Sequence, residues 1–385
     1  MKKGTPALLL MVLFAAFPFP PNAAARSKPA AARGRVINGN SAMQPALECS
    51  KCHSDIFHNW KQSMHAAAFE NPVFQTAYRK AWLVEGPEAA RSCLPCHAPN
   101  ANVTGDHGEA QAITREGVTC ISCHGTAAAG MRTAHDDRSD DPLGGMKHPT
   151  PAAVKTGTHT NSGHGGNFSG IRPCAGCHDS ENRHKTHISA TQTEWSASPS
   201  AAAGETCQKC HMPSVSGRTA NKDGREGMHD HSLAATLETI REAVTAEITD
   251  VTVNSGAVTA SITLRNAKAG HSVPTGSPAR SLVLEVRLMN AAGTVLETQK
   301  RIYRKALADA NGNGLSSYGD AFLHAATVTF DNRLAPGETR VETVSFKSFP
   351  GENAKVTVEL YLLANPDVAQ RVEMKIPLSI AGGIK

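Results

Sequence analysis

The pattern of hydrophobic and polar positions divides the chain into two halves of different character. Beyond Ile248, apolar residues alternate with polar ones at a period of two, which is typical of half-buried strands. Such runs lie at 258–264, 282–288 and 356–362, with three further runs near 294–303, 325–330 and 340–346. Turn sequences such as 290–293 and Pro336-Gly337 separate the runs. The pattern predicts an antiparallel β-sandwich of immunoglobulin-like type over residues 247–385.

The half before residue 247 shows helical periodicity in two short stretches. Ile56, Trp60 and Met64 repeat at helical spacing, which predicts a helix that begins near Ser54 and carries His65. A second amphipathic helix, with Ser232 as its candidate N-cap, is predicted by the spacing of Leu233, Leu237, Ile240 and Val244.

Much of this first half is poor in conventional core residues. Residues 125–170 are mainly Gly, Ala, Thr, His and Asp with scattered prolines. Such a composition buries too little apolar area to offset the entropy cost of ordering the chain. We therefore expect short helices and long loops around a bound group that supplies the core, and an unfolded protein without that group.

One motif, Cys-x-x-Cys-His, occurs five times in this half and uses all ten cysteines. Its two thiols can form thioethers with one porphyrin, and the histidine that follows can ligate the iron. Zinc sites also use such cysteine pairs, but they do not need a histidine after every pair. The sequence thus predicts five covalently bound haem c groups, attached and ligated by Cys49, Cys52, His53, Cys93, Cys96, His97, Cys120, Cys123, His124, Cys174, Cys177, His178, Cys207, Cys210 and His211.

Other histidines are candidates for the second axial position of each iron. His65 lies close to the first motif, and His271 lies in a glycine-proline loop, residues 270–276, between two predicted strands. Irons with two imidazole ligands suit electron transfer, whereas catalysis needs an open position. The predicted second ligands are His65, His271, His187, His231 and His148, with His184, His229, His164 and His58 as alternatives.

Composition and the first residues give expectations about class and location. The chain has 385 residues, 40% of them apolar, and a net charge of +5, which is typical of a two-domain globular protein without a nucleic-acid partner. Basic residues at 2–3, an apolar run at 7–17 and alanines at 23–25 predict a signal peptide over residues 1–25. The apolar run is too short for a transmembrane anchor. We expect export to the periplasm or the cell surface, a flexible leader over 26–45 and a haem domain over 46–246.

Several of these features occur together in one known family. They are the first motif followed by Trp60, Ser63 and His65, the Gly117-Val118-Thr119 approach to the third motif, Trp195 and Ser198 ahead of the fifth motif, Met212-Pro213 after it, and the loop at 270–276. In these features the chain resembles the multihaem cytochromes c of the cytochrome c554-like group. The resemblance implies electron transfer outside the cytoplasmic membrane, largely through haems with two histidine ligands, with His65 and His271 as distal ligands.

The sequence as a whole predicts an α+β protein of two domains. A mainly helical and irregular multihaem domain would pass electrons between redox partner proteins in a respiratory or extracellular chain, and the sandwich would support or dock it. Two alternatives stay open. A multihaem oxidoreductase acting on a small nitrogen or sulfur compound needs one open iron, and a polymeric cytochrome filament needs contacts between copies of this chain.

Overall fold

A computed structural model describes residues 45–124, 172–222, 226–233, 237–254, 256–347, 354–363 and 375–383. The predicted signal peptide and His148 lie outside these described residues, as does all of the predicted leader except Pro45. Residues 43–385 form one compact unit. The predicted boundary between a haem domain and a β-sandwich domain, at residues 246 and 247, therefore stays a prediction. None of the helices in the described ranges is long and apolar enough to cross a membrane.

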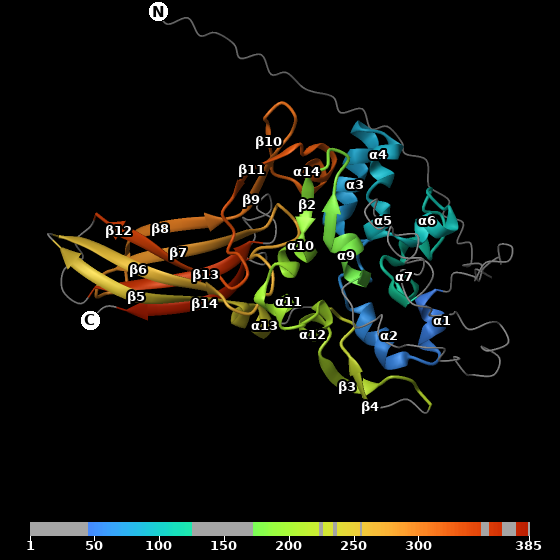
Figure 1. Ribbon diagram of the computed structural model, residues 1–385, viewed down its shortest axis with the longest axis horizontal. Coiled ribbons are helices and arrows are strands. Elements are labelled where there is room, and N and C mark those ends of the chain that lie inside the picture. The colour runs from blue at the N-terminus through green and yellow to red at the C-terminus, as the bar shows by residue number, and fades with distance from the viewer. Residues whose placement is uncertain are drawn as a thin grey trace, which may run out of the picture. The chain divides into compact units, whose positions relative to one another are not determined.

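The first half of the described chain is built from short helices joined by loops, as the sequence predicts (Figure 1). Two small antiparallel hairpins interrupt them, β1 (Asp179–Glu181) with β2 (His187–Ala190) and β3 (Ser214–Arg218) with β4 (Glu226–His229). The helices are α1 (Ala46–Ser50), α2 (Ser54–Lys61), α3 (Pro72–Val84), α4 (Pro87–Arg91), α5 (Leu94–His97), α6 (Asn100–Thr104), η1 (Thr114–Glu116), α7 (Cys120–His124), α9 (Arg172–His178), α10 (Thr191–Ser196), α11 (Pro199–Ala202) and α12 (Cys207–His211).

Helix α3 gives this half a small apolar core of its own. The Asn71 side chain caps the helix by accepting hydrogen bonds from the backbone N–H groups of Val73 and Phe74. Phe74 and Tyr78 on α3 pack with Phe69, with Ala90 of α4 and with Leu94 of α5. The sequence predicts little core in this half, and α3 is the main exception.

The β-rich half contains two antiparallel sheets that share one hydrophobic core (Figure 1). Residues of β6 and β7 such as Ile262, Leu264, Leu282 and Leu284 are fully buried in it. This agrees with the period of two in the sequence. One sheet has the order β12-β6-β5 and the other β14-β13-β7-β8. The strands are β5 (Val244–Asn254), β6 (Ala257–Asn266), β7 (Ser281–Met289), β8 (Val295–Tyr303), β12 (Thr339–Phe346), β13 (Lys355–Leu363) and β14 (Lys375–Gly383).

A third sheet lies between these strands in the sequence, with the order β10-β9-β11. It consists of β9 (Lys305–Ala308), β10 (Gly314–Leu315) and β11 (Thr327–Asp331), and helix α14 (Tyr318–His324) contacts it and α3. The sequence prediction that the run at 325–330 belongs to the sandwich is therefore wrong. A period of two identifies a strand, but it does not identify the neighbour with which the strand pairs.

The two predicted helices end or begin at other residues than expected. Helix α2 ends at Lys61, so His65 does not lie on it, and Met64 is exposed. The buried Ser63 accepts a hydrogen bond from the N–H of Ala66 and starts a separate turn. Helix α13 (Leu237–Ala243) excludes Leu233, whose φ of +53° is not helical, and Val244 already begins β5.

Candidate functional site

Each Cys-x-x-Cys-His motif lies on or beside one short helix. The third, fourth and fifth motifs lie within α7, α9 and α12, and the second starts at the N-cap of α5. The first begins in α1 and ends in the turn that follows. Residues three apart lie on the same side of a helix, so the two thiols of a motif can reach one ligand. None of the ten cysteines forms a disulfide, which leaves them available for thioether bonds.

Cysteines of different motifs lie next to one another. The fold brings the first motif beside the third, the second beside the fourth, and the fourth beside the fifth, through contacts of Cys49 with Cys120, Cys96 with Cys177 and Cys174 with Cys207. Cys123 of the third motif is also close to Cys174 and Cys177 of the fourth. The five attachment positions therefore form one continuous group in space.

Three motif histidines each face a histidine from another part of the chain. The ring centroids are 6.1, 6.2 and 6.5 Å apart, and the ring planes make angles of 69°, 23° and 13°. In the same order, the pairs are His178 with His65, His124 with His231, and His211 with His271. Sequence reasoning selects His65, His231 and His271 as second ligands, and the structure brings each of them to a motif histidine.

The separation of the paired rings suits two axial ligands of one metal ion. A metal–imidazole bond is about 2 Å long and the nitrogen lies about 1 Å from the ring centre, so two rings on opposite sides of one metal have centroids about 6 Å apart. Rings in direct stacking contact lie closer, as Phe74 and His97 do at 3.9 Å. Each of the three pairs therefore has the spacing that one iron atom requires.

Hydrogen bonds at Nδ1 orient several of these imidazoles. Nδ1 of His53 donates to the carbonyl of Thr219 at 2.6 Å, and Nδ1 of His97 donates to that of Ala68 at 3.0 Å. Nδ1 of His231 and of His271 likewise bond to backbone carbonyls, at 2.8 and 3.0 Å. A proton held at Nδ1 leaves the lone pair of Nε2 for a metal. His58 and His229 make similar bonds, so the bond fixes ring orientation without identifying a ligand.

Burial lowers the pKa of the paired histidines for which a shift is resolved. The pKa of His178 falls to about 4, and those of His65, His211, His231 and His271 also fall. Neutral imidazole, the form that binds metals, therefore predominates at neutral pH. The rings nevertheless keep accessible surface, since four of these five are half-buried and His178 is exposed. Each of these residues is thus at least partly accessible, as an imidazole that ligates an inserted porphyrin must be.

Comparison with known proteins supports this interpretation of the motifs. The crystal structure of a penta-heme cytochrome c552 from Thermochromatium tepidum has a similar fold, with a TM-score of 0.66 and 23% identity over 88% of this chain and 98% of that chain. The family model for cytochrome c554 and c-prime matches residues 48–125, which contain the first three motifs. Residues 48–125 belong to the cytochrome c554 family, and the chain as a whole has the fold of a multihaem cytochrome c.

Other solved structures match only a minor part of this cytochrome. Bacteroides uniformis beta-glucuronidase 2, covalently bound to cyclophellitol-6-carboxylate aziridine, is 16% identical over 37% of this chain and 12% of that chain, with a TM-score of 0.17. A putative beta-galactosidase from Bacteroides fragilis is 13% identical over 37% of this chain and 15% of that chain, with a TM-score of 0.19. A search of curated proteins found no match.

His65 of the cytochrome is held by backbone packing around the first and third motifs. Its carbonyl accepts a hydrogen bond from the N–H of Val118, and the carbonyl of Val118 accepts one from the buried Trp60 indole at 2.9 Å. Gly117 has a φ of +72° and passes so close to this segment that a Cβ there would lie 2.5 Å from the His65 carbonyl oxygen. The segment that precedes the third motif and the segment around His65 thus hold each other in place.

His271 is held by a loop that the haem-binding half clamps. A Glu194 carboxylate oxygen on α10 accepts hydrogen bonds from the Ser272 N–H at 3.2 Å and the Thr275 hydroxyl at 2.7 Å. Its other oxygen forms an ion pair with Arg333 at 2.6 Å, and both side chains are about nine-tenths buried. Arg333 also donates to the Pro274 carbonyl at 3.2 Å. This network ties the loop to the segment that precedes the fifth motif.

The two Trp-x-x-Ser stretches have the same local structure. Ser63 accepts from the N–H three residues later, and Ser198 does the same as the N-cap of α11. Ser200 stands where His65 stands in the first stretch, and a Cβ at Gly270 would lie 3.3 Å from the Ser200 Cβ. Ser200 itself cannot serve as a ligand in the way His65 can. The neighbouring loop instead brings a histidine, His271, next to Ser200.

The structure places the remaining predicted ligands differently. His187 lies between two carboxylates, with Nε2 2.8 Å from Glu181 and Nδ1 3.4 Å from Asp179. His184 accepts a hydrogen bond at Nε2 from Arg183. His148 and His164 lie outside the described residues. The assignment of His187 or His148 to an iron stays a prediction.

Sequence reasoning missed the residues that position the ligands. Glu194 and Arg333 are 139 residues apart, and no local pattern marks either one. Gly117 was part of a recognised motif, but its close contact with His65 joins segments about fifty residues apart. The available sequence signal for this contact was Gly117 itself, before the third motif, because glycine alone adopts a positive φ easily.

Proposed function

We propose that this cytochrome holds five covalently attached haem c groups and carries electrons between redox partner proteins outside the cytoplasmic membrane. Bound haem c supplies a one-electron iron couple, and the five motifs supply ten thiols and five proximal imidazoles for it. The three histidine pairs carry the proposal. An iron between two imidazoles has no position left for a substrate, which favours electron transfer over catalysis.

The arrangement of the motifs supports this function. Cysteines of the first and third motifs are in contact, as are those of the fourth and fifth and of the second and fourth, and Cys123 of the third lies close to the fourth. Attachment positions that adjoin keep the groups they hold close together, which rapid electron exchange requires. His65, His231 and His271 serve as second ligands in this proposal, while His187 and His148 remain the candidates for the other two irons.

Electron paramagnetic resonance of the oxidised holoprotein tests the paired ligation. Low-spin haems whose imidazole planes are nearly perpendicular give signals with a large maximum g value, and nearly parallel planes give rhombic signals. The angle of 69° for His65 and His178 predicts the first type, and the angles of 23° and 13° predict the second. We expect both types in the spectrum.

Two variants assign the signals. In His65→Ala the large-g signal from the site of His178 should disappear while the rhombic signals remain. His58→Ala is the matched control, because His58 is exposed on α2 and bonds within its own helix to Ser54. An unchanged spectrum in His65→Ala, in protein with its full haem content, would contradict the proposed ligand pair.

A further inference from the structure

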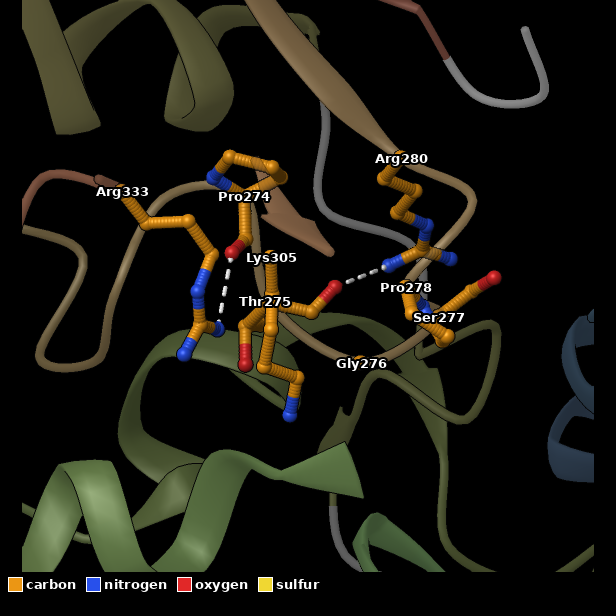
Figure 2. A pocket seen from close by; sticks show the side chains of 8 residues that line it. All are labelled: Pro274, Thr275, Gly276, Ser277, Pro278, Arg280, Lys305 and Arg333. Atoms are coloured by element: carbon orange, nitrogen blue, oxygen red, sulfur yellow. Dashed lines mark hydrogen bonds between the residues drawn. The ribbon is translucent and has the colours of Figure 1, made fainter. Parts of the chain in front are cut away.

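Arg280 lies at the end of the loop that carries His271 and reaches back to it. Its Nη1 donates a hydrogen bond to the Thr275 carbonyl at 3.1 Å, as Figure 2 shows. Gly276, with a φ of +76°, leaves room for the guanidinium, because a Cβ there would lie 3.3 Å from Nη1. The loop therefore holds the charged end of Arg280 in a defined position.

No carboxylate neutralises Arg280 within the described part of the chain. Arg333, which lines the same pocket, pairs with Glu194 at 2.6 Å and with Asp331 at 2.8 Å. Within the described residues, the guanidinium of Arg280 donates a hydrogen bond to a neutral carbonyl, that of Thr275. The two arginines approach the loop at different carbonyl groups, as the dashed lines in Figure 2 show.

The guanidinium of Arg280 is available to pair with an anion. Its surface is accessible, and the protein around it lowers the Arg280 pKa by partial desolvation. Arginine keeps its proton in proteins, so the side chain stays a cation. Pairing with an anion would offset the cost of that partial desolvation.

Arg280 is also near the ligands of two proposed haems. It holds Thr275 in the loop of His271, whose ring faces His211 of the fifth motif, and its charge also acts on the His178 imidazole of the fourth. The phenol of the half-buried Tyr318 lies close to Arg280 and to Cys96 and Cys177. The guanidinium thus lies where the haem of the fourth motif or that of the fifth can present a carboxylate.

We infer that Arg280 binds a propionate carboxylate of one of these two haems. The inference rests on the proposed function, because it requires haem at His178 or at His211. Haem carries two propionates, and a guanidinium pairs with a carboxylate through two parallel hydrogen bonds. Neutralising a propionate beside the iron disfavours the oxidised state and therefore raises the reduction potential of that haem.

Potentiometric titration of holoprotein, followed by electron paramagnetic resonance, tests this role. In Arg280→Gln the midpoint potential of the large-g signal or of one rhombic signal should fall, while both signals keep their shape. In Arg280→Lys the midpoint potential should fall less than in Arg280→Gln, because lysine keeps the charge but loses the paired hydrogen-bond geometry. Arg301→Gln is the control for net charge, because Arg301 lies on β8 beside Glu342.

The outcomes distinguish a failure of the propionate contact from a failure of the proposed function on which it rests. An unshifted Arg280→Gln, or an equal fall in Arg301→Gln, overturns the propionate contact while leaving the haem ligation intact. Absence of both low-spin signals from the unmodified protein overturns the proposed function itself. Inorganic phosphate and nitrite are the probes for a free oxyanion: if either shifts the Arg280-dependent potential in unmodified protein, Arg280 binds solute and the propionate assignment is wrong.

Discussion

Replacement of His271 by alanine is expected to make about one haem per chain reactive toward carbon monoxide. The His271 ring lies 6.5 Å from that of His211 and nearly parallel to it, in the geometry of two ligands on one iron. Loss of the imidazole leaves the iron with one protein ligand and an open position. The measurement is the carbon monoxide difference spectrum of dithionite-reduced holoprotein, with haem per chain counted on the same sample.

His229→Ala is the matched control for this substitution. His229 is exposed on β4 and its Nδ1 donates to the Met212 carbonyl, so the same change there should leave the difference spectrum unaltered. The proposed pair is wrong if His271→Ala keeps its full haem content and binds no more carbon monoxide than the unmodified protein does.

Gly117→Ala is expected to cause a much larger loss of stability than Gly204→Ala. Both glycines have a φ of +72°, which costs any other residue about 1–2 kcal/mol, and the ψ of −139° at Gly117 is accessible essentially to glycine alone. Only at Gly117 would the new Cβ also meet backbone, at 2.5 Å from the His65 oxygen and 3.1 Å from the Ala66 oxygen. Backbone cannot move aside as a flexible side chain does, so we expect an additional loss of about 2–3 kcal/mol or more.

Denaturant unfolding of the two holoprotein variants gives the comparison. Gly204→Ala measures the cost of the backbone conformation alone, because nothing lies within 4 Å of its added Cβ. The displaced His65 segment should also make the site of His178 reactive toward carbon monoxide in Gly117→Ala. Equal free energies of unfolding for the two variants would mean that the contact between Gly117 and His65 does not exist in solution.

The sequence predicted features that depend on short-range spacing. The five motifs are local, and each lies on or beside one helix because three-residue spacing and helical geometry agree. The alternation in β6, β7 and β13 likewise identifies strands that bury every second residue or more. The resemblance to the cytochrome c554 family follows from the same local motifs, and the family model matches residues 48–125.

Features that depend on pairing across long distances could not be predicted. The strand near residue 327 was recognised, but its pairing with β9 rather than with the sandwich depends on where the chain turns after α14. His65 was expected on a helix, whereas that helix ends at Lys61 and the Ser63 hydroxyl begins another turn. His65 faces His178 even so, because Gly117 and Val118 hold its backbone.

The count of covalent haems per chain, taken together with carbon monoxide binding, tests the central proposal most directly. Pyridine haemochrome analysis of purified holoprotein should give five haems per chain, one for each motif. At least three of them should not react with carbon monoxide, because His65, His231 and His271 close those sites. Fewer than five covalent haems, or carbon monoxide binding at more than two, would contradict the account of this protein as a pentahaem electron carrier.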